Sequence, residues 1–209
     1  MFAACTYEEI EKTERLIENK EIVVLLFARA TETEILKEFE YIHYNSGKYC
    51  SVYAVGYTDD STKQDDPFFR KVNVNVNNTW YFSTKAFVDF KEKLQNRIKW
   101  TYSGETEVLI LQNNPGQRNV LNFQNYVAID VNKGIREGYI DSFQNFIESL
   151  IRSAHKRVNA KTVVVDIERD RISIKEMVSS AINESKRISA PIKLILRDRL
   201  FYKPSRSIV

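Results

Sequence analysis

The stretch Tyr126–Val131, with the sequence YVAIDV, is a short apolar run that ends in a carboxylate and a valine. A second run of the same kind, Val163–Glu168 (VVVDIE), follows after a helical stretch. Between them, apolar residues recur at helical spacing from Tyr139 to Val158, which is typical of an amphipathic helix packed on a sheet. This order predicts a strand–helix–strand unit with parallel strands, and the rest of the chain is interpreted around it.

The flanking segments extend this pattern in both directions. Downstream, a capping box at Ser173–Glu176 and a last apolar run at Ile192–Leu196 complete a predicted βαβαβ unit. Upstream, the fully apolar run Ile22–Phe27 is typical of a strand buried on both faces. It is followed by a predicted helix at Thr31–Asn45 and a predicted strand at Tyr49–Tyr57, which make a second parallel unit.

We therefore predict an α/β fold made of two α/β halves with mainly parallel strands, which could pack into one continuous sheet. The halves are residues 1–112 and residues 119–209, divided by the turn cluster Asn113–Gln117. The first half also holds three further predicted features: a capping box at Thr6–Glu9, a helix capped by Ser83, and a hairpin that joins Trp100–Tyr102 to Glu107–Gln112.

Composition limits the class of protein. Of the 209 residues, 43% are hydrophobic and 28% are charged, close to an ordinary globular domain. No apolar run approaches the roughly 20 residues that cross a bilayer, so we expect no membrane span and no signal peptide. The only cysteines, Cys5 and Cys50, are far apart, so we expect no disulfide framework, no zinc site and a cytoplasmic location.

Charge is distributed unevenly along the chain. Residues 1–66 hold 7 Lys or Arg and 14 Asp or Glu, whereas the remainder holds 24 and 14. The basic part ends in a tail with two aromatic residues, Phe201 and Tyr202, among the basic residues Arg197, Arg199, Lys203 and Arg206. Such a tail suits nucleic acid, because cations meet phosphates and aromatic rings stack on bases. It suits a protein partner equally well, and a frayed chain end with no binding role is the third interpretation.

The carboxylates Asp130, Asp166 and Glu168 are the best candidates for a catalytic site. Ligands of open α/β sheets bind at the carboxyl ends of parallel strands, where these residues would meet if their strands were neighbours. Paired carboxylates there could hold Mg²⁺ for phosphodiester chemistry. The alternative is structural, since Asp and Glu commonly end strands and cap the turn that follows.

The chain lacks the common catalytic signatures, with no glycine-rich phosphate loop, no nucleophile elbow and only two histidines. We therefore expect no cofactor. Aromatic residues are abundant on the predicted strands of the first half, and such residues are enriched at interfaces. The leading hypothesis is a non-catalytic protein-interaction subunit of a cytoplasmic complex, which binds a partner protein or a second copy of itself through Tyr53, Trp80, Tyr81, Phe201 and Tyr202. The alternative is an enzyme or binder that acts on nucleic acid.

Overall fold

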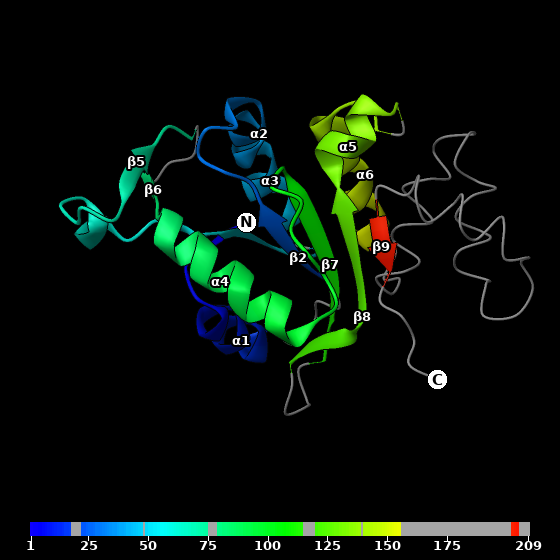
Figure 1. The fold of residues 1–209 in the computed structure, drawn as a ribbon, viewed down its shortest axis with the longest axis horizontal. Helices are drawn as coiled ribbons and strands as arrows, with labels where there is room; N and C mark the ends of the chain where they lie inside the picture. Colours follow the sequence, from blue (N-terminus) through cyan, green and yellow to red (C-terminus); the bar gives the residue numbers. More distant parts are fainter. Residues whose placement is uncertain are drawn as a thin grey trace, which may run out of the picture.

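The chain forms two β-sheets, and helices cover the larger sheet (Figure 1). The computed structural model describes residues 1–17, 22–47, 49–74, 79–114, 120–138, 140–155 and 202–204. Sheet A has, in spatial order, the strands β1 (Phe2–Ala4), β3 (Ser51–Val55), β2 (Ile22–Phe27), β7 (Glu107–Asn113), β8 (Leu121–Asp130) and β9 (Tyr202–Pro204). Sheet B has the order β4 (Tyr57–Thr58), β6 (Trp80–Phe82) and β5 (Arg70–Val72).

Strand direction corrects the predicted fold class. Only β1, β3 and β2 run parallel to one another, whereas β2 with β7, β7 with β8 and β8 with β9 are antiparallel. All of sheet B is antiparallel as well. The prediction of mainly parallel strands is therefore wrong, and the fold is α/β with a mixed sheet. The reason is the short connection between β7 and β8, because only antiparallel neighbours can be joined without a long crossover.

The same strands overturn the predicted hairpin at residues 100–112. Trp100 and Tyr102 are not in a strand, and the neighbours of β7 are β2 and β8. Of the predicted βαβαβ unit, the segments Val163–Glu168 and Ile192–Leu196 lie outside the described residues. The two predicted halves both contribute strands to sheet A, and the division of the chain at residues 113–118 stays a prediction.

Several local predictions in the first half are confirmed. The Thr6 hydroxyl accepts a hydrogen bond from the Glu9 amide at 3.3 Å, and the Glu9 carboxylate accepts from the Thr6 amide at 3.1 Å. This capping box begins α1 (Tyr7–Leu16). Every residue of β2 is buried, and β2 pairs in parallel with β3. Ser83 caps α4 (Thr84–Arg97) by accepting from the Ala86 amide at 3.2 Å.

Gly56 divides the predicted strand Tyr49–Tyr57 between the two sheets. Its φ of +83° lies in the left-handed region, and a Cβ there would lie 2.7 Å from the Cβ of Phe87. Its amide donates to the Ala4 carbonyl at 2.8 Å, and its carbonyl accepts from the Ser83 amide at 2.9 Å. The chain therefore leaves sheet A and enters sheet B at a position that only glycine fills without strain.

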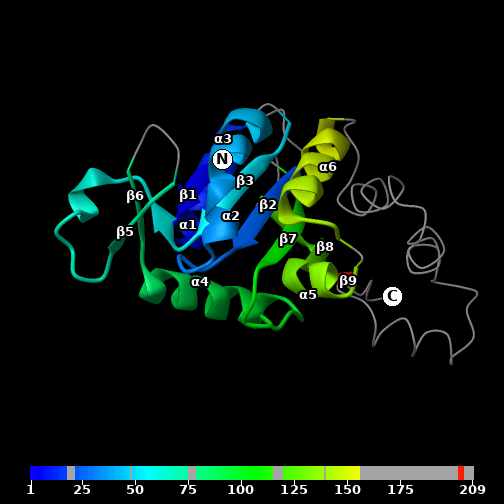
Figure 2. The ribbon, with the colours of Figure 1, turned by 90° about the horizontal axis from the view of Figure 1, so that it is seen from above.

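Helices lie on both faces of sheet A, with α4 on one face and α3 (Phe39–Ser46) and α6 (Phe143–His155) on the other (Figure 2). The predicted helix Thr31–Asn45 is divided at Glu38 into α2 (Thr33–Lys37) and α3. A short helix, α5 (Val131–Arg136), follows β8 directly, and one turn of 3₁₀ helix, η1 (Ser61–Lys63), precedes β5. Among the described residues, no helix is both long and apolar enough to cross a membrane.

Candidate functional site

Carboxylates gather at the edge of sheet A where β2 and β8 end and β7 begins. Phe27, Glu107 and Asp130 form one cross-strand row there, since Glu107 pairs with Phe27 on one side and with Asp130 on the other. Glu32 and Glu105 lie in the adjoining loops. We call Glu32, Glu105, Glu107 and Asp130 the carboxylate edge. It contains one residue of the site predicted from the sequence.

Glu107 ties the segment after α4 to the sheet. Its side chain is buried, and its carboxylate accepts hydrogen bonds from Trp100 Nε1 at 2.5 Å and from the Ser103 amide at 2.6 Å. The Trp100 ring also packs on Phe27, with ring centroids 4.8 Å apart. Burial raises the pKa of Glu107, the hydrogen bonds from Ser103 and Trp100 oppose the rise, and the charge of Asp130 adds to it.

Asp130 caps the helix that follows it. Its carboxylate accepts from the Lys133 amide at 2.8 Å, so it is the N-cap of α5. The amide of the next residue, Val131, donates to the Thr106 carbonyl at 3.0 Å and joins α5 to the loop before β7. These bonds match the structural alternative that the sequence left open for Asp130.

Glu32 and Glu105 fasten the surrounding loops. The Glu32 carboxylate accepts from the Arg29 amide at 3.0 Å and from the Thr106 hydroxyl. Burial raises the pKa of Glu32, while the Arg29 amide bond and charge lower it and the charge of Glu105 raises it. Glu105 forms an ion pair with Arg136 of α5. Each of the four carboxylates therefore helps to hold a loop or a helix end against sheet A.

The carboxylate edge is not arranged as a metal centre in the part of the chain that the structure describes. Within those residues, no group of three or more His, Cys, Asp or Glu side chains could hold a metal ion. Asp166 and Glu168, the other predicted members of the Mg²⁺ site, lie outside the described residues. A catalytic role for the three carboxylates and the nucleic-acid hypothesis both stay predictions.

The predicted interaction residues are placed in two groups. Tyr53, Trp80 and Tyr81 are buried within the chain. The Tyr53 hydroxyl donates to the buried Glu14 at 2.6 Å, and the Trp80 ring packs on Phe39 at a centroid distance of 5.8 Å. These three residues therefore build the core under sheet B and beside α1, and do not form an exposed surface of the described chain.

The predicted tail residues belong to β9 or to the sequence on either side of it. The backbone of β9 pairs Tyr202 with Ile129 and Lys203 with Ala128, which adds an edge strand to sheet A. The remaining members of the tail set are outside the described residues: Arg197, Arg199, Phe201 and Arg206. Their predicted roles in binding a partner or nucleic acid stay predictions.

Phe68, which the sequence analysis placed in a loop, is a large aromatic residue exposed on the surface. We call residues 57–74 and 79–82, which include sheet B and η1, the sheet B lobe; it lies at one end of the molecule, away from β8 and β9 (Figure 1). Phe68 on this lobe is 69% exposed. The signal in the sequence is the pair Phe68-Phe69 directly after Pro67, inside an otherwise polar stretch.

Comparison with known proteins finds no relative. No family model matches the chain, and searches of curated proteins and of solved structures return no match either. The class that the structure defines is therefore an α/β protein with a mixed six-stranded sheet and a small antiparallel lobe. Any function has to be argued from the contacts, burial and charge of the described residues.

Proposed function

We propose that the chain is a non-catalytic, protein-binding subunit of a cytoplasmic complex, and that the sheet B lobe is its partner-binding surface. The single observation that carries this proposal is Phe68, a large apolar side chain that is 69% exposed in the loop before β5. Covering a side chain of this size stabilises a complex by about 1.5–3 kcal/mol, and aromatic residues are frequent energetic centres of interfaces.

The loop that carries Phe68 is held in one conformation by its own side chains. The Asp66 carboxylate accepts from the Phe68 amide at 3.0 Å and forms an ion pair with Lys63 at 3.6 Å. The Lys63 ammonium lies 5.3 Å from the centre of the Phe69 ring, a cation–π contact. A preorganised loop loses little conformational entropy on binding, which favours a recognition role.

Two acidic residues of the lobe, Asp60 and Asp66, form hydrogen bonds that shape this loop. Asp60 caps η1 by accepting from the Thr62 amide at 2.9 Å, as Asp66 does for the Phe68 turn. These bonds are the turn-forming contacts that Asp makes in many loops. Asp60 and Asp66 are therefore part of the loop structure that displays Phe68.

The cytoplasmic location in the proposal is supported by the two cysteines. Neither Cys5 nor Cys50 is in a disulfide, and Cys50 is buried. The Cys5 thiol donates to the Tyr57 carbonyl at 3.4 Å, and burial raises its pKa to about 12. Free, unreactive thiols are the usual state of cysteine in a reducing compartment.

The test compares two variants that each remove one exposed apolar side chain. Phe68→Ser changes the lobe, and Leu16→Ser changes an equally exposed residue, 78% exposed, at the end of α1. The wild-type chain, immobilised, should capture a protein from lysate of the source cells that rebinds the chain when purified. The affinity of that protein should fall about tenfold or more for Phe68→Ser, a hot-spot loss, and stay unchanged for Leu16→Ser. If no captured protein depends on Phe68, the proposal is wrong.

A further inference from the structure

The outer strand of the lobe, β5, has one edge that no other described strand pairs with. Sheet B has the order β4–β6–β5, so among the described residues β5 pairs with β6 alone. The register places Arg70 opposite Phe82, Lys71 opposite Tyr81 and Val72 opposite Trp80. An edge strand presents backbone N–H and C=O groups on its free side, and an extended peptide can add to them as a further strand.

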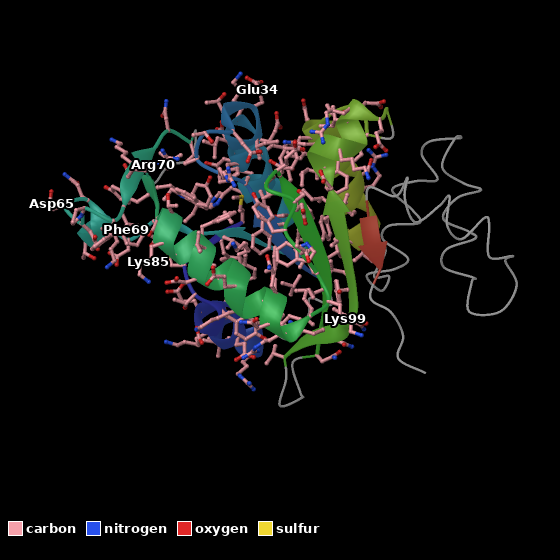
Figure 3. All side chains as sticks on the ribbon, viewed as in Figure 1. Glu34, Asp65, Phe69, Arg70, Lys85 and Lys99 are labelled. Carbon is pink, nitrogen blue, oxygen red and sulfur yellow. The ribbon has the colours of Figure 1, made fainter. Side chains whose placement is uncertain are left out.

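The exposed side chains of this edge are positively charged, and they follow directly after the acidic part of the sequence. Arg70 and Lys71 are exposed, and residues 67–74 hold these two cations and no acid. Residues 1–66, by contrast, hold 14 acids and 7 bases. Figure 3 shows Arg70 and Phe69 together on the lobe, while Lys99 lies near the far end of α4. The open edge is therefore a local cationic surface beside the exposed Phe68.

Charge selects among the segments that could add to this edge. A second copy of β5 would set Arg70 and Lys71 of the two chains against each other, and like charges directly opposite on paired strands are destabilising. An acidic strand would instead place carboxylates opposite these cations. Phe68, two residues before β5, would then meet an apolar side chain of the same peptide.

We propose that the β5 edge accepts an extended, acidic segment of a partner protein as a fourth strand of sheet B. This inference rests on the proposed function, because it names the chemistry of the partner that the lobe binds. Main-chain hydrogen bonds supply part of the affinity, and Arg70, Lys71 and Phe68 supply the selectivity.

The test uses defined probes. One is an end-capped synthetic peptide with two adjacent Glu residues, one for each face of the strand, flanked by Thr and a single Leu, and the second replaces each Glu by Lys. A third is the acidic peptide N-methylated at alternate residues, so that one of its edges cannot donate hydrogen bonds. At low salt, the wild-type chain should bind the acidic peptide, with amide chemical-shift changes in β5. The Lys peptide should not bind, and N-methylation of the paired edge should abolish binding.

The matched variants are Lys71→Glu on the edge and Lys99→Glu away from it, both at exposed lysines. Lys71→Glu should weaken the acidic peptide about tenfold, because an opposite-charge pair becomes a like-charge pair, and Lys99→Glu should leave it unchanged. Equal loss in both variants, or no binding of the acidic peptide by the wild-type chain, overturns the inference.

Two controls exclude other occupants. Binding of a single-stranded oligonucleotide that depends on Lys71 and competes with the peptide would overturn the inference in favour of nucleic acid. A dimer that sedimentation detects for the wild-type chain and not for Lys71→Glu would overturn it in favour of a second copy. The two proposals can fail separately. A captured partner that depends on Phe68 but not on Lys71 contradicts the β5 inference and leaves the protein-binding role standing.

Discussion

The carboxylate edge and the sheet B lobe contain the same kinds of side chain, acids next to aromatic rings, but these side chains have different roles in the two regions. At the carboxylate edge, Glu107 is buried and bonded to Trp100 and Ser103, and Trp100 is covered by Phe27. On the lobe, Asp66 shapes a turn whose Phe68 is left exposed. The difference teaches that the position of an acid in the sequence says little about catalysis until its hydrogen-bond partners are known.

The largest effect on stability is expected at Gly56, where the chain passes from sheet A into sheet B of the lobe. A Cβ at this position would be only 2.7 Å from the Phe87 Cβ, with φ at +83°. Gly56→Val should therefore lower the free energy of unfolding by about 3 kcal/mol or more, from left-handed strain together with overpacking. Urea unfolding followed by circular dichroism measures it. Gly104→Val is the control, because Gly104 also has a positive φ but has open space around a new Cβ. It should lose less free energy of unfolding, and the difference between the two variants measures the packing contribution. Equal losses in both variants would contradict this account of the junction.

Removing the buried Glu107 carboxylate should lower the free energy of unfolding nearly as much as Gly56→Val does. Glu107→Ala leaves the buried Trp100 Nε1 and the partly buried Ser103 amide without their acceptor, and an unsatisfied buried donor costs about 1–3 kcal/mol. We expect a loss of about 2–4 kcal/mol in urea unfolding and a change in tryptophan fluorescence. Glu105→Ala, which removes an exposed ion pair with Arg136, is the control and should cost less than about 1 kcal/mol. A stable Glu107→Ala chain would show that the edge is not a structural junction.

The cap of α5 should have a moderate effect. Asp130→Ala removes the acceptor for the Lys133 amide and should cost about 1 kcal/mol, whereas Asp130→Asn should retain most of the stability. Thermal unfolding of the two variants distinguishes these outcomes. If Asp130→Asn is as unstable as Asp130→Ala, capping is not what Asp130 contributes.

The pH dependence of stability provides a smaller test of the same edge. The pKa of Glu107 in the folded chain is raised above its ordinary value of 4.5, so the folded state holds this proton more tightly than the unfolded state. The contribution of Glu107 to stability is therefore greatest below pH 4.5 and decreases as the pH rises through the folded pKa. Glu107→Gln should remove this decrease when unfolding is measured from pH 4 to pH 7. An unchanged pH profile in Glu107→Gln would contradict burial as the cause.

Local signals in the sequence predicted local structure well. Thr6 with Glu9, and Ser83 before α4, are helix starts set by neighbours within three residues, and the apolar run of β2 predicted its complete burial. Strand direction was predicted wrongly, because it depends on which distant strand becomes the neighbour. The run at residues 107–112 has the same pattern whether its partner is residues 100–102 or, as observed, β2 and β8.

The site was predicted only in part for a similar reason. Asp130 was singled out because it follows an apolar strand, and its catalytic role stays a prediction; Glu107 reaches the same edge through sheet pairing that no short pattern reveals. The aromatic residues Tyr53, Trp80 and Tyr81 were assigned to interaction because alternation on a strand does not show which faces are covered. Phe68 carried a usable signal, two adjacent aromatic residues after a proline in a polar stretch.

The central claim is that the lobe binds a partner while the carboxylate edge supports the fold. The most direct measurement is the dissociation constant of the purified captured partner for three folded chains: wild type, Phe68→Ser and Asp130→Asn. The account predicts that Phe68→Ser weakens binding about tenfold or more with a stability change within about 0.5 kcal/mol, and that Asp130→Asn binds as the wild type does. Full affinity in Phe68→Ser together with lost affinity in Asp130→Asn would contradict it.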